Sequence, residues 1–293
     1  MDKLVQAKKI VDDYYKKRNP NEEDEYLFVE ALNYIIDKTG DPDYITSLGG
    51  YYYGKKKFDL ALKYYLIAAE SDNKYALNGL GYIYYYGRCG EVNYELAFKY
   101  YKRAAELGED EAKMKLSDMY QKGIGTEKDL NKSKEILNEL YEKEKGSKNA
   151  YSLYPQIVIR LSTYWIDDKE YEKAFSELIK SKDYIKSRLV YNDFFGEFTN
   201  MEIIINKIYQ CIEFNKLDMD IYDIFYYFKN VGKVSFMYEN NKYYINSELD
   251  GDMVSIEFNG KWYHDVRDFL KNAKIADKRI TSISYYIYDV IGE

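Results

Sequence analysis

Three stretches of the chain have residue types and spacings that could bind an ion or support catalysis. The first, Gly49-Gly-Tyr-Tyr-Tyr-Gly54-Lys55-Lys56, comes within one residue of a phosphate-binding loop. That loop needs Ser or Thr after its lysine to hold Mg²⁺, and this chain has Lys56 at that position. The stretch also falls at the end of an expected helix instead of between a strand and a helix. We therefore interpret its glycines as structural.

The second stretch has the spacing of a calcium-binding loop, with Gly251 at the sixth position and Glu257 at the twelfth. Asn246 and Glu248 stand at two positions where Asp-type ligands are preferred, and the flanking residues alternate as strands do. A polar hairpin turn at 250–252 is the favoured interpretation.

The third candidate is the single histidine, His264, at an expected strand-to-helix junction. Catalysis there would need a nucleophile or a carboxylate partner, and the sequence fixes neither nearby. Cys89 and Cys211 can form neither a disulfide framework nor a four-thiolate metal site, which fits a reducing compartment. The sequence therefore predicts no catalytic residue, no cofactor and no metal, and a protein that is not an enzyme.

The composition is that of a folded chain with ample core material. Of its 293 residues, 46% are hydrophobic, while 17 Gly and 3 Pro exclude collagen-like or low-complexity folds. The net charge of −7 offers no broad basic surface and argues against a nucleic-acid partner. There is neither a signal-peptide pattern nor an apolar run long enough for a membrane span, so we expect a cytoplasmic protein. Nothing in the composition indicates the oligomeric state.

The elements that must position any binding residues are repeated. The pattern of residues 80–105 recurs thirty-six residues later, and its second half also recurs thirty-six residues earlier. The first half of that earlier unit is offset by only thirty-two, so four residues are missing from its inter-helix loop. Each unit has two runs of apolar residues at helical spacing, which predicts a pair of helices, A and B. Leu80 and Tyr84 are expected on the core side of helix A.

Outside these three units we expect further helix pairs at 3–17 and 23–38, at 153–166 and 169–189, and at 200–214 and 218–229. After Gly232 the apolar residues alternate instead, which predicts short strands with turns at Asn240-Asn241 and Asn259-Gly260. A helix should then start at Asp265, and 280–291 could be helix or strand. The predicted fold is mainly α: an α/α solenoid of helix pairs over 1–231, followed by a small α+β module over 232–293.

The best repeat, Tyr94-Glu-Leu-Ala97-Phe-Lys-Tyr-Tyr101-Lys-Arg-Ala104-Ala105-Glu-Leu-Gly108, follows a Leu-Gly-x-x-Tyr-x-x-Gly segment. Together they resemble the Sel1-like repeat, a relative of the tetratricopeptide repeat, and the resemblance covers 44–144. The third unit departs from it with Ser117, Ser133 and Leu140-Tyr141. The ending of the C-terminal module, Phe258 to Tyr263 running into a helix, weakly resembles the RAMA module of restriction and modification enzymes.

The resemblance to tetratricopeptide arrays implies a concave face on the A helices that binds a protein or peptide. Carried over on the Leu-Gly-x-x-Tyr frame, the partner-binding positions are Tyr53, Asn78, Tyr82, Tyr85, Tyr86, Asp118, Gln121 and Lys122. The leading hypothesis is a non-enzymatic adaptor or scaffold. An alternative has the C-terminal module bind nucleic acid or another ligand while the repeats tether it. A hydrolase is the least favoured, because no catalytic constellation is visible.

Overall fold

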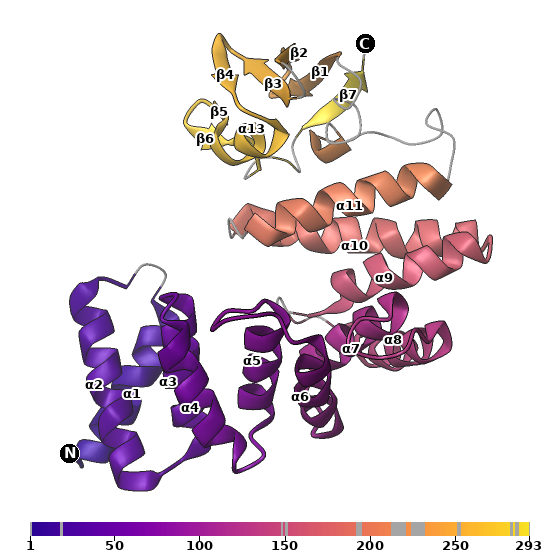
Figure 1. Cartoon of the computed structure of the whole chain (residues 1–293). Coiled ribbons are helices and arrows are strands. Elements are labelled where there is room, and N and C mark those ends of the chain that lie inside the picture. Colours follow the sequence, from indigo (N-terminus) through magenta and orange to yellow (C-terminus); the bar gives the residue numbers. More distant parts are fainter. Residues whose placement is uncertain are drawn as a thin grey trace. The chain divides into compact units, whose positions relative to one another are not determined.

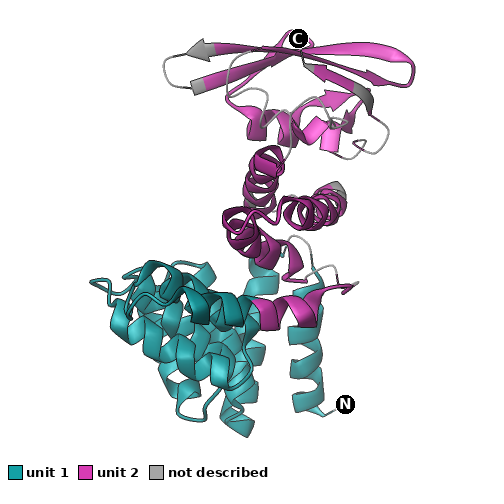
Figure 2. Cartoon of the chain, turned by 90° about the vertical axis from the view of Figure 1, so that its right-hand side faces the viewer, with its two compact units in different colours: residues 1–137 teal, residues 138–293 magenta. Residues whose placement is uncertain are grey.

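The computed structural model of the chain describes residues 2–17, 20–147, 149, 152–191, 195–211, 221–223, 232–250, 253–281, 284 and 287–292. The chain divides into two compact units, 1–137 and 138–293 (Figure 2). Helices form the first unit, and the second contains further helices followed by an antiparallel sheet (Figure 1). The fold is mainly α, a solenoid of helix pairs followed by a small α+β module, which confirms the predicted class.

Helix pairs follow one another along unit 1. The A helices are α1 (Lys3–Lys16), α3 (Pro42–Gly54), α5 (Lys74–Tyr85) and α7 (Asp110–Lys122). The B helices are α2 (Glu22–Thr39), α4 (Phe58–Ala69), α6 (Tyr94–Glu106) and α8 (Leu130–Glu144), the last of which continues past the end of unit 1. Helix α1 contacts α2, α3 contacts α4, and α5 contacts α6. The last pair is linked by a hydrogen bond that the Ser133 hydroxyl of α8 donates to the Ser117 carbonyl of α7 over 2.8 Å. Successive A helices α3, α5 and α7 are neighbours, as expected for stacked repeats.

Local sequence signals explain where these helices start and stop. Asn21 and Asp24 form a capping box at the start of α2, and the Asn73 side chain accepts backbone hydrogen bonds at the start of α5. Gly123 ends α7 in the left-handed conformation, with φ of 67°. The loop of the first repeat, 55–57, is shorter than the corresponding loop 86–93 of the second, which confirms the predicted gap.

Two B-helix tyrosines fill the spaces between A helices. Tyr65 on α4 lies against Gly49 and Gly79, where an added Cβ would come within 2.7 and 2.6 Å of its ring. Tyr101 on α6 lies equally close to Gly81 and is fully buried. A ring can approach a helix this closely only where the helix has no side chain, so these glycines are required by packing.

Unit 2 begins with three described helices, α9 (Tyr154–Asp167), α10 (Tyr171–Tyr191) and α11 (Phe195–Cys211), which contact one another. The predicted pair at 153–166 and 169–189 is confirmed. The next predicted helix, 200–214, starts five residues earlier, at Phe195. Of the predicted helix 218–229, the described part is the 3₁₀ turn η2 (Ile221–Asp223), and the rest lies outside the described residues.

The C-terminal residues form a five-stranded antiparallel sheet in the order β4-β3-β2-β1-β7. Its strands are β1 (Lys233–Tyr238), β2 (Asn241–Asp250), β3 (Met253–Phe258), β4 (Lys261–Tyr263) and β7 (Tyr288–Gly292), and a two-stranded sheet pairs β5 (Lys274–Ile275) with β6 (Lys278–Arg279). Helix α13 (Val266–Asn272) packs against β3 and β4. The ring of Phe269 lies 5.4 Å from that of Phe258, so helix and sheet share one core.

The predicted strands are confirmed, and so is the Asp265 N-cap of α13. Asn259 and Gly260 both have positive φ, as the predicted type I′ turn requires. The other turn was predicted one residue too late: positive φ falls on Glu239 and Asn240, and Asn241 already pairs with Tyr238. The ambiguous segment 280–291 contributes strand β7, which runs antiparallel to β1.

Candidate functional site

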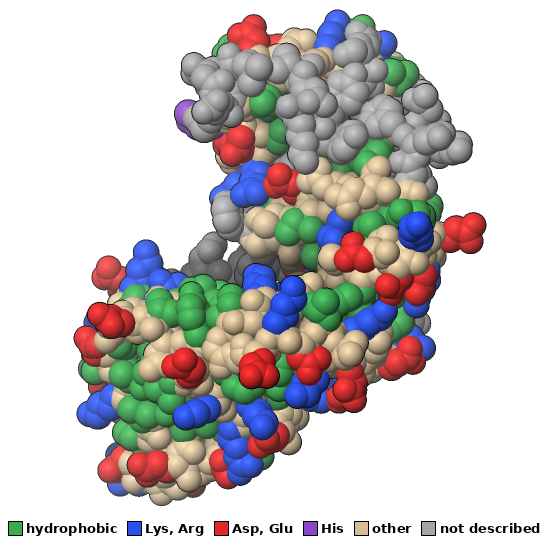
Figure 3. Space-filling model, turned by 45° about the vertical axis from the view of Figure 1, so that its right-hand side comes forward, with side chains coloured by type: hydrophobic (Ala, Val, Ile, Leu, Met, Phe, Trp, Pro, Cys, Tyr) green, Lys and Arg blue, Asp and Glu red, His purple; other side chains and the backbone are tan. Residues whose placement is uncertain are grey.

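The eight positions carried over from the repeat frame lie on three neighbouring A helices, α3, α5 and α7, of unit 1. Seven of them are within these helices, and Tyr86 is the residue that ends α5. Residues three or four apart share one face of a helix, so Asn78, Tyr82 and Tyr85 are placed together by the helix period alone. Figure 3 shows hydrophobic side chains gathered on unit 1 among acidic and basic ones.

Three tyrosines at the end of α5 form the centre of the site. The Tyr82 and Tyr86 rings are stacked with their centroids 6.0 Å apart, and Tyr85 meets Tyr86 edge-on at 5.0 Å. Tyr86 is 44% exposed, while Tyr82 and Tyr85 are half-buried. We call these three residues the tyrosine cluster. It presents aromatic surface to solvent on a rigid helix end, which is a common property of protein-binding anchors.

A lysine of the next repeat lies on the tyrosine cluster. The Nζ atom of Lys115 on α7 is 4.8 Å from the Tyr82 ring centroid, 5.7 Å from that of Tyr86 and 5.9 Å from that of Tyr85. It also lies 3.5 Å from the Tyr86 hydroxyl. Sequence reasoning missed Lys115, although its place one turn before Asp118 was a usable signal.

The cluster rests on the buried ring of Tyr101, which meets Tyr82 edge-on at 5.9 Å. Burial raises the pKa of Tyr85, and so, more weakly, do its neighbours Tyr86, Tyr94 and Asp118. Asp118, a predicted site residue on α7, is therefore close enough to influence a hydroxyl of the cluster. The structure thus brings three of the predicted positions, the three tyrosines, into contact, and Asp118 lies near enough to Tyr85 to contribute to its raised pKa.

Tyr53, the predicted position of the first repeat, reaches the cluster through two intermediates. Its ring packs edge-on against Phe58 at 5.3 Å. The Arg88 guanidinium lies 5.3 Å from the Phe58 centroid and 5.1 Å from that of Tyr86. Phe58 and the Arg88 guanidinium therefore connect Tyr53 of α3 to Tyr86 at the end of α5.

The three remaining positions are placed differently. Asn78 is 8% exposed and donates a hydrogen bond from its amide to Glu111 of α7 over 3.3 Å, so it joins two A helices. Gln121 is half-exposed and Lys122 is exposed. No ring contact with the tyrosine cluster is found for either of these two in the described part of the chain.

On α3 the face that corresponds to the tyrosine cluster is hollow. With the thirty-two-residue offset, Gly50 and Gly54 stand at the positions of Tyr82 and Tyr86. A hollow of about 350 Å³ opens there, lined by Tyr14, Tyr15, Phe28, Ser47, Gly50, Tyr51 and Gly54. Four of these residues are aromatic, so the hollow is mostly apolar.

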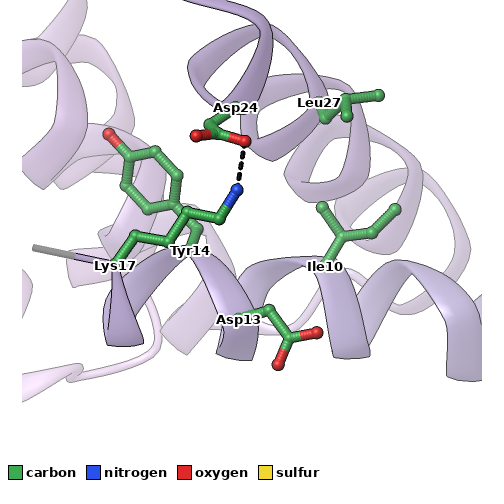
Figure 4. A pocket seen from close by; sticks show the side chains of 6 residues that line it. All are labelled: Ile10, Asp13, Tyr14, Lys17, Asp24 and Leu27. Atoms are coloured by element: carbon green, nitrogen blue, oxygen red, sulfur yellow. Dashed lines mark hydrogen bonds and ion pairs between the residues drawn. The ribbon is translucent and has the colours of Figure 1, made fainter. Parts of the chain in front are cut away.

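A smaller hollow of about 150 Å³ lies between α1 and α2 (Figure 4). Ile10 and Leu27 lie on one side of it, and an ion pair between Lys17 and Asp24 crosses the other. Asp13, which also lines this hollow, pairs with Lys16. The charged groups of the hollow therefore already have partners, so it has less to offer a ligand than the hollow on α3.

The stretches that resemble ion-binding motifs have structural roles. The loop-like segment 49–56 ends α3, with Gly49 packed on Tyr65. The calcium-like spacing falls on the β2–β3 hairpin, where Asp250 pairs with Met253 and the Asn246 amide donates to Glu257 over 2.7 Å; Gly251 and Asp252 lie outside the described residues. Within the described ranges no group of three or more His, Cys, Asp or Glu side chains could hold a metal. In the same ranges no helix is long and apolar enough to cross a membrane.

Comparison with known proteins gives the family. The Sel1 repeat model matches residues 44–73, 74–109 and 110–143. The crystal structure of a Sel1 repeat protein from Oxalobacter formigenes is 30% identical in sequence, with 41% of this chain and 91% of that chain covered and a TM-score of 0.35. The chain belongs to the Sel1-repeat family. Its three matched Sel1 repeats are the helix pairs α3/α4, α5/α6 and α7/α8.

A second similar structure is a protective antigen of uropathogenic Escherichia coli with an SLR fold, 22% identical. It covers 71% of this Sel1-repeat chain with a TM-score of 0.49, and this chain spans 45% of that protein. No curated protein matches the chain. The Sel1 match ends at residue 143, and the comparisons give no support to the weak resemblance of the C-terminal residues to the RAMA module.

Proposed function

We propose that this Sel1-repeat protein is a non-enzymatic adaptor, and that its partner, a protein or peptide, binds along the face formed by α3, α5 and α7. Sel1 repeats generally mediate protein–protein interaction and are typically non-enzymatic scaffolds. The observation that supports this face is the tyrosine cluster, where Tyr82, Tyr85 and Tyr86 converge on a partly exposed surface.

Physical chemistry favours this face for binding. A tyrosine contributes a large apolar area with few rotatable bonds, so little conformational entropy is lost when a partner covers it. Here the rings are already held by stacking on one another and by Lys115, which lowers that cost further. The neighbouring hollow on α3 adds a recess in which a partner side chain can be buried.

In this proposal the predicted partner-binding positions have different roles. The tyrosine cluster supplies most of the binding energy, and Tyr53 extends it toward α3. Asp118, Gln121 and Lys122 form the α7 edge and influence which partner is selected. Asn78, being buried and bonded to Glu111, keeps α5 and α7 in register. We also propose that the module at 232–293 is a domain separate from the repeats at 1–231.

The test is affinity capture from native lysate with the full chain, followed by mass spectrometry. Tyr86→Ala should abolish the capture of specific partners, because losing an aromatic anchor commonly costs about 2 kcal/mol or more. Tyr75→Ala is the matched control: Tyr75 is also on α5 and is 54% exposed, but it lies at the opposite end of the helix. Equal loss for both variants, or for neither, would contradict the proposed face.

A second candidate function concerns the outer face of the C-terminal sheet. Tyr244 and Trp262 are 42% and 51% exposed, and the register Asn246–Glu257–Trp262 places them on one face. Lys233 and Lys242 lie over the Tyr244 ring at 4.1 and 5.3 Å. Exposed rings flanked by cations suit a single-stranded nucleic acid. Binding of a labelled oligonucleotide by the full chain that weakens with salt and is lost in Tyr244→Ala would support this function.

A further inference from the structure

Two cations lie on the same exposed ring of the tyrosine cluster. The Lys115 Nζ is 5.7 Å from the Tyr86 centroid, and the Arg88 guanidinium carbon is 5.1 Å from it. Lys115 comes from α7 and Arg88 from the loop that follows α5, so two separate segments each direct a positive charge to one point of the proposed binding face.

Among the residues that the structure describes, neither cation has a carboxylate partner. Other cations of unit 1 do: Lys55 pairs with Glu25, Lys74 with Glu109 and Arg103 with Asp72. For Lys115 and Arg88, the described residues supply aromatic rings and one hydroxyl, with no carboxylate oxygen within 4.0 Å.

The carboxylates near Lys115 on its own helix have other contacts. Glu111, one turn earlier, accepts the Asn78 amide. Asp118, one turn later, lies near enough to Tyr85 to contribute to the raised pKa of that residue, and it forms no ion pair with Lys115 among the described residues. Lys115 is half-buried, and its ammonium lies over aromatic ring faces, which attract a cation more weakly than a carboxylate does. A carboxylate of a bound ligand could form an ion pair with Lys115, and a second carboxylate could do so with Arg88.

We infer that the segment of the partner lying over Tyr86 is acidic, with carboxylates that pair with Lys115 and Arg88 while an apolar part covers the tyrosine rings. The inference rests on the proposed binding face and names the chemistry of its ligand. The chain carries a net charge of −7, so it exerts no general attraction on acidic peptides. Recognition must therefore depend on these two local cations.

The probe is a displayed library of randomised twelve-residue peptides, selected on the full chain. We expect the selected peptides to be enriched in Asp and Glu. Measured individually, they should bind the double variant Lys115→Met, Arg88→Gln at least about tenfold more weakly than the wild type, because a close charge pair is lost. Methionine keeps the apolar contact of the lysine stem with the rings.

The matched control is the double variant Lys99→Met, Lys102→Met, which removes two exposed lysines of α6 that have no contact with the tyrosine cluster in the described structure. It should bind the same peptides as the wild type does. Selected peptides that need Tyr86 but are neutral or basic, or that bind the Lys115/Arg88 variant normally, would overturn the acidic ligand and leave the binding face standing. Peptides that are indifferent to Tyr86→Ala, or a library that yields none, would count against both. Tight binding of a thymidine hexanucleotide in place of acidic peptides would also overturn the inference.

Discussion

The first and second Sel1 repeats use the same backbone to present opposite surfaces. Gly50 and Gly54 on α3 stand where α5 has Tyr82 and Tyr86, so one repeat has a hollow and the other a cluster of rings. Both helices keep the glycine that admits a B-helix tyrosine, Gly49 in the first and Gly81 in the second. The comparison shows that the packing side of a repeat can be held constant while its outer side is rebuilt.

The same comparison explains the position of Lys115. Tyr65 lies between Gly49 of its own repeat and Gly79 of the next. One repeat later, the residue equivalent to Gly79 is Lys115, and its side chain extends over the rings of α5. At equivalent positions, one repeat therefore has a glycine that admits a B-helix ring, and the next has a lysine whose ammonium lies over the A-helix rings of the preceding repeat.

The largest expected effect separates packing from binding within α5. Tyr84 stacks on Tyr100 at 5.6 Å and is packed against the cores of both repeats, whereas Tyr86 is exposed. Tyr84→Ala should lower the free energy of unfolding by about 3 kcal/mol, since a large packed ring is lost. Tyr86→Ala should change it by less than about 0.5 kcal/mol. Urea unfolding followed by far-ultraviolet circular dichroism measures both, and the reverse order would show that the two faces of α5 are misassigned.

The buried tyrosines should make both repeats sensitive to alkali. Burial raises the pKa of Tyr65 to about 12, above the ordinary value of 10.0, and it also raises the pKa of Tyr101. The folded state therefore holds protons that the unfolded state releases, so stability is full below pH 10 and falls as the pH rises toward 12. For Tyr65 the loss should reach about 2 kcal/mol.

Tyr65→Phe should remove the part of the alkaline loss of stability that comes from Tyr65, whereas Tyr75→Phe, at an exposed position, should leave that loss unchanged. Urea unfolding of the three proteins at pH 8 and at increasing alkaline pH provides the measurement. The same alkaline slope in all three proteins would mean that Tyr65 contributes nothing to it.

Glycines on the two sides of an A helix should respond oppositely to alanine. At Gly81 an added Cβ would collide with the Tyr101 ring, so Gly81→Ala should destabilise by about 1–3 kcal/mol. At Gly54 there is open space within 4 Å, so Gly54→Ala should be neutral or stabilise by up to about 0.5–1 kcal/mol. Thermal melts of the two variants give the comparison, and a destabilised Gly54→Ala would mean that the hollow is less open than described.

The smallest effect concerns one hydroxyl. The Tyr101 Oη is buried and finds no hydrogen-bond partner among the residues the structure describes. Tyr101→Phe should therefore stabilise the protein at neutral pH by about 1 kcal/mol, because an unsatisfied polar group is removed with the ring retained. A clear loss of stability in the same unfolding assay would indicate that the hydroxyl has a partner, such as bound water.

The sequence predicted the elements of the repeats well because their signals are local. Helix period, caps such as Asn73 and the left-handed Gly123 act within a few residues, and the repeat offset then fixed which faces meet. The part of the site that was missed depends on side chains from different repeats. Lys115 lies on the cluster, and Asn78 is buried, only because α5 and α7 are neighbours. The shifted turn at Glu239–Asn240 has another cause: several Asn-containing registers are compatible with one hairpin sequence.

Tryptophan is distributed unevenly along this chain in a way that provides optical reporters. Trp165, 2% exposed, lies in α9, and Trp262, 51% exposed, lies in β4, so both belong to residues 138–293 and the Sel1 repeats at 44–143 have none. Selective excitation of tryptophan therefore produces no fluorescence from the Sel1 repeats. The buried Trp165 should emit at a shorter wavelength than the exposed Trp262. The emission of the helices before residue 231 can therefore be distinguished from that of the sheet after it. Two emission changes at different urea concentrations would identify the sheet as an independent domain, using light from the unmodified protein.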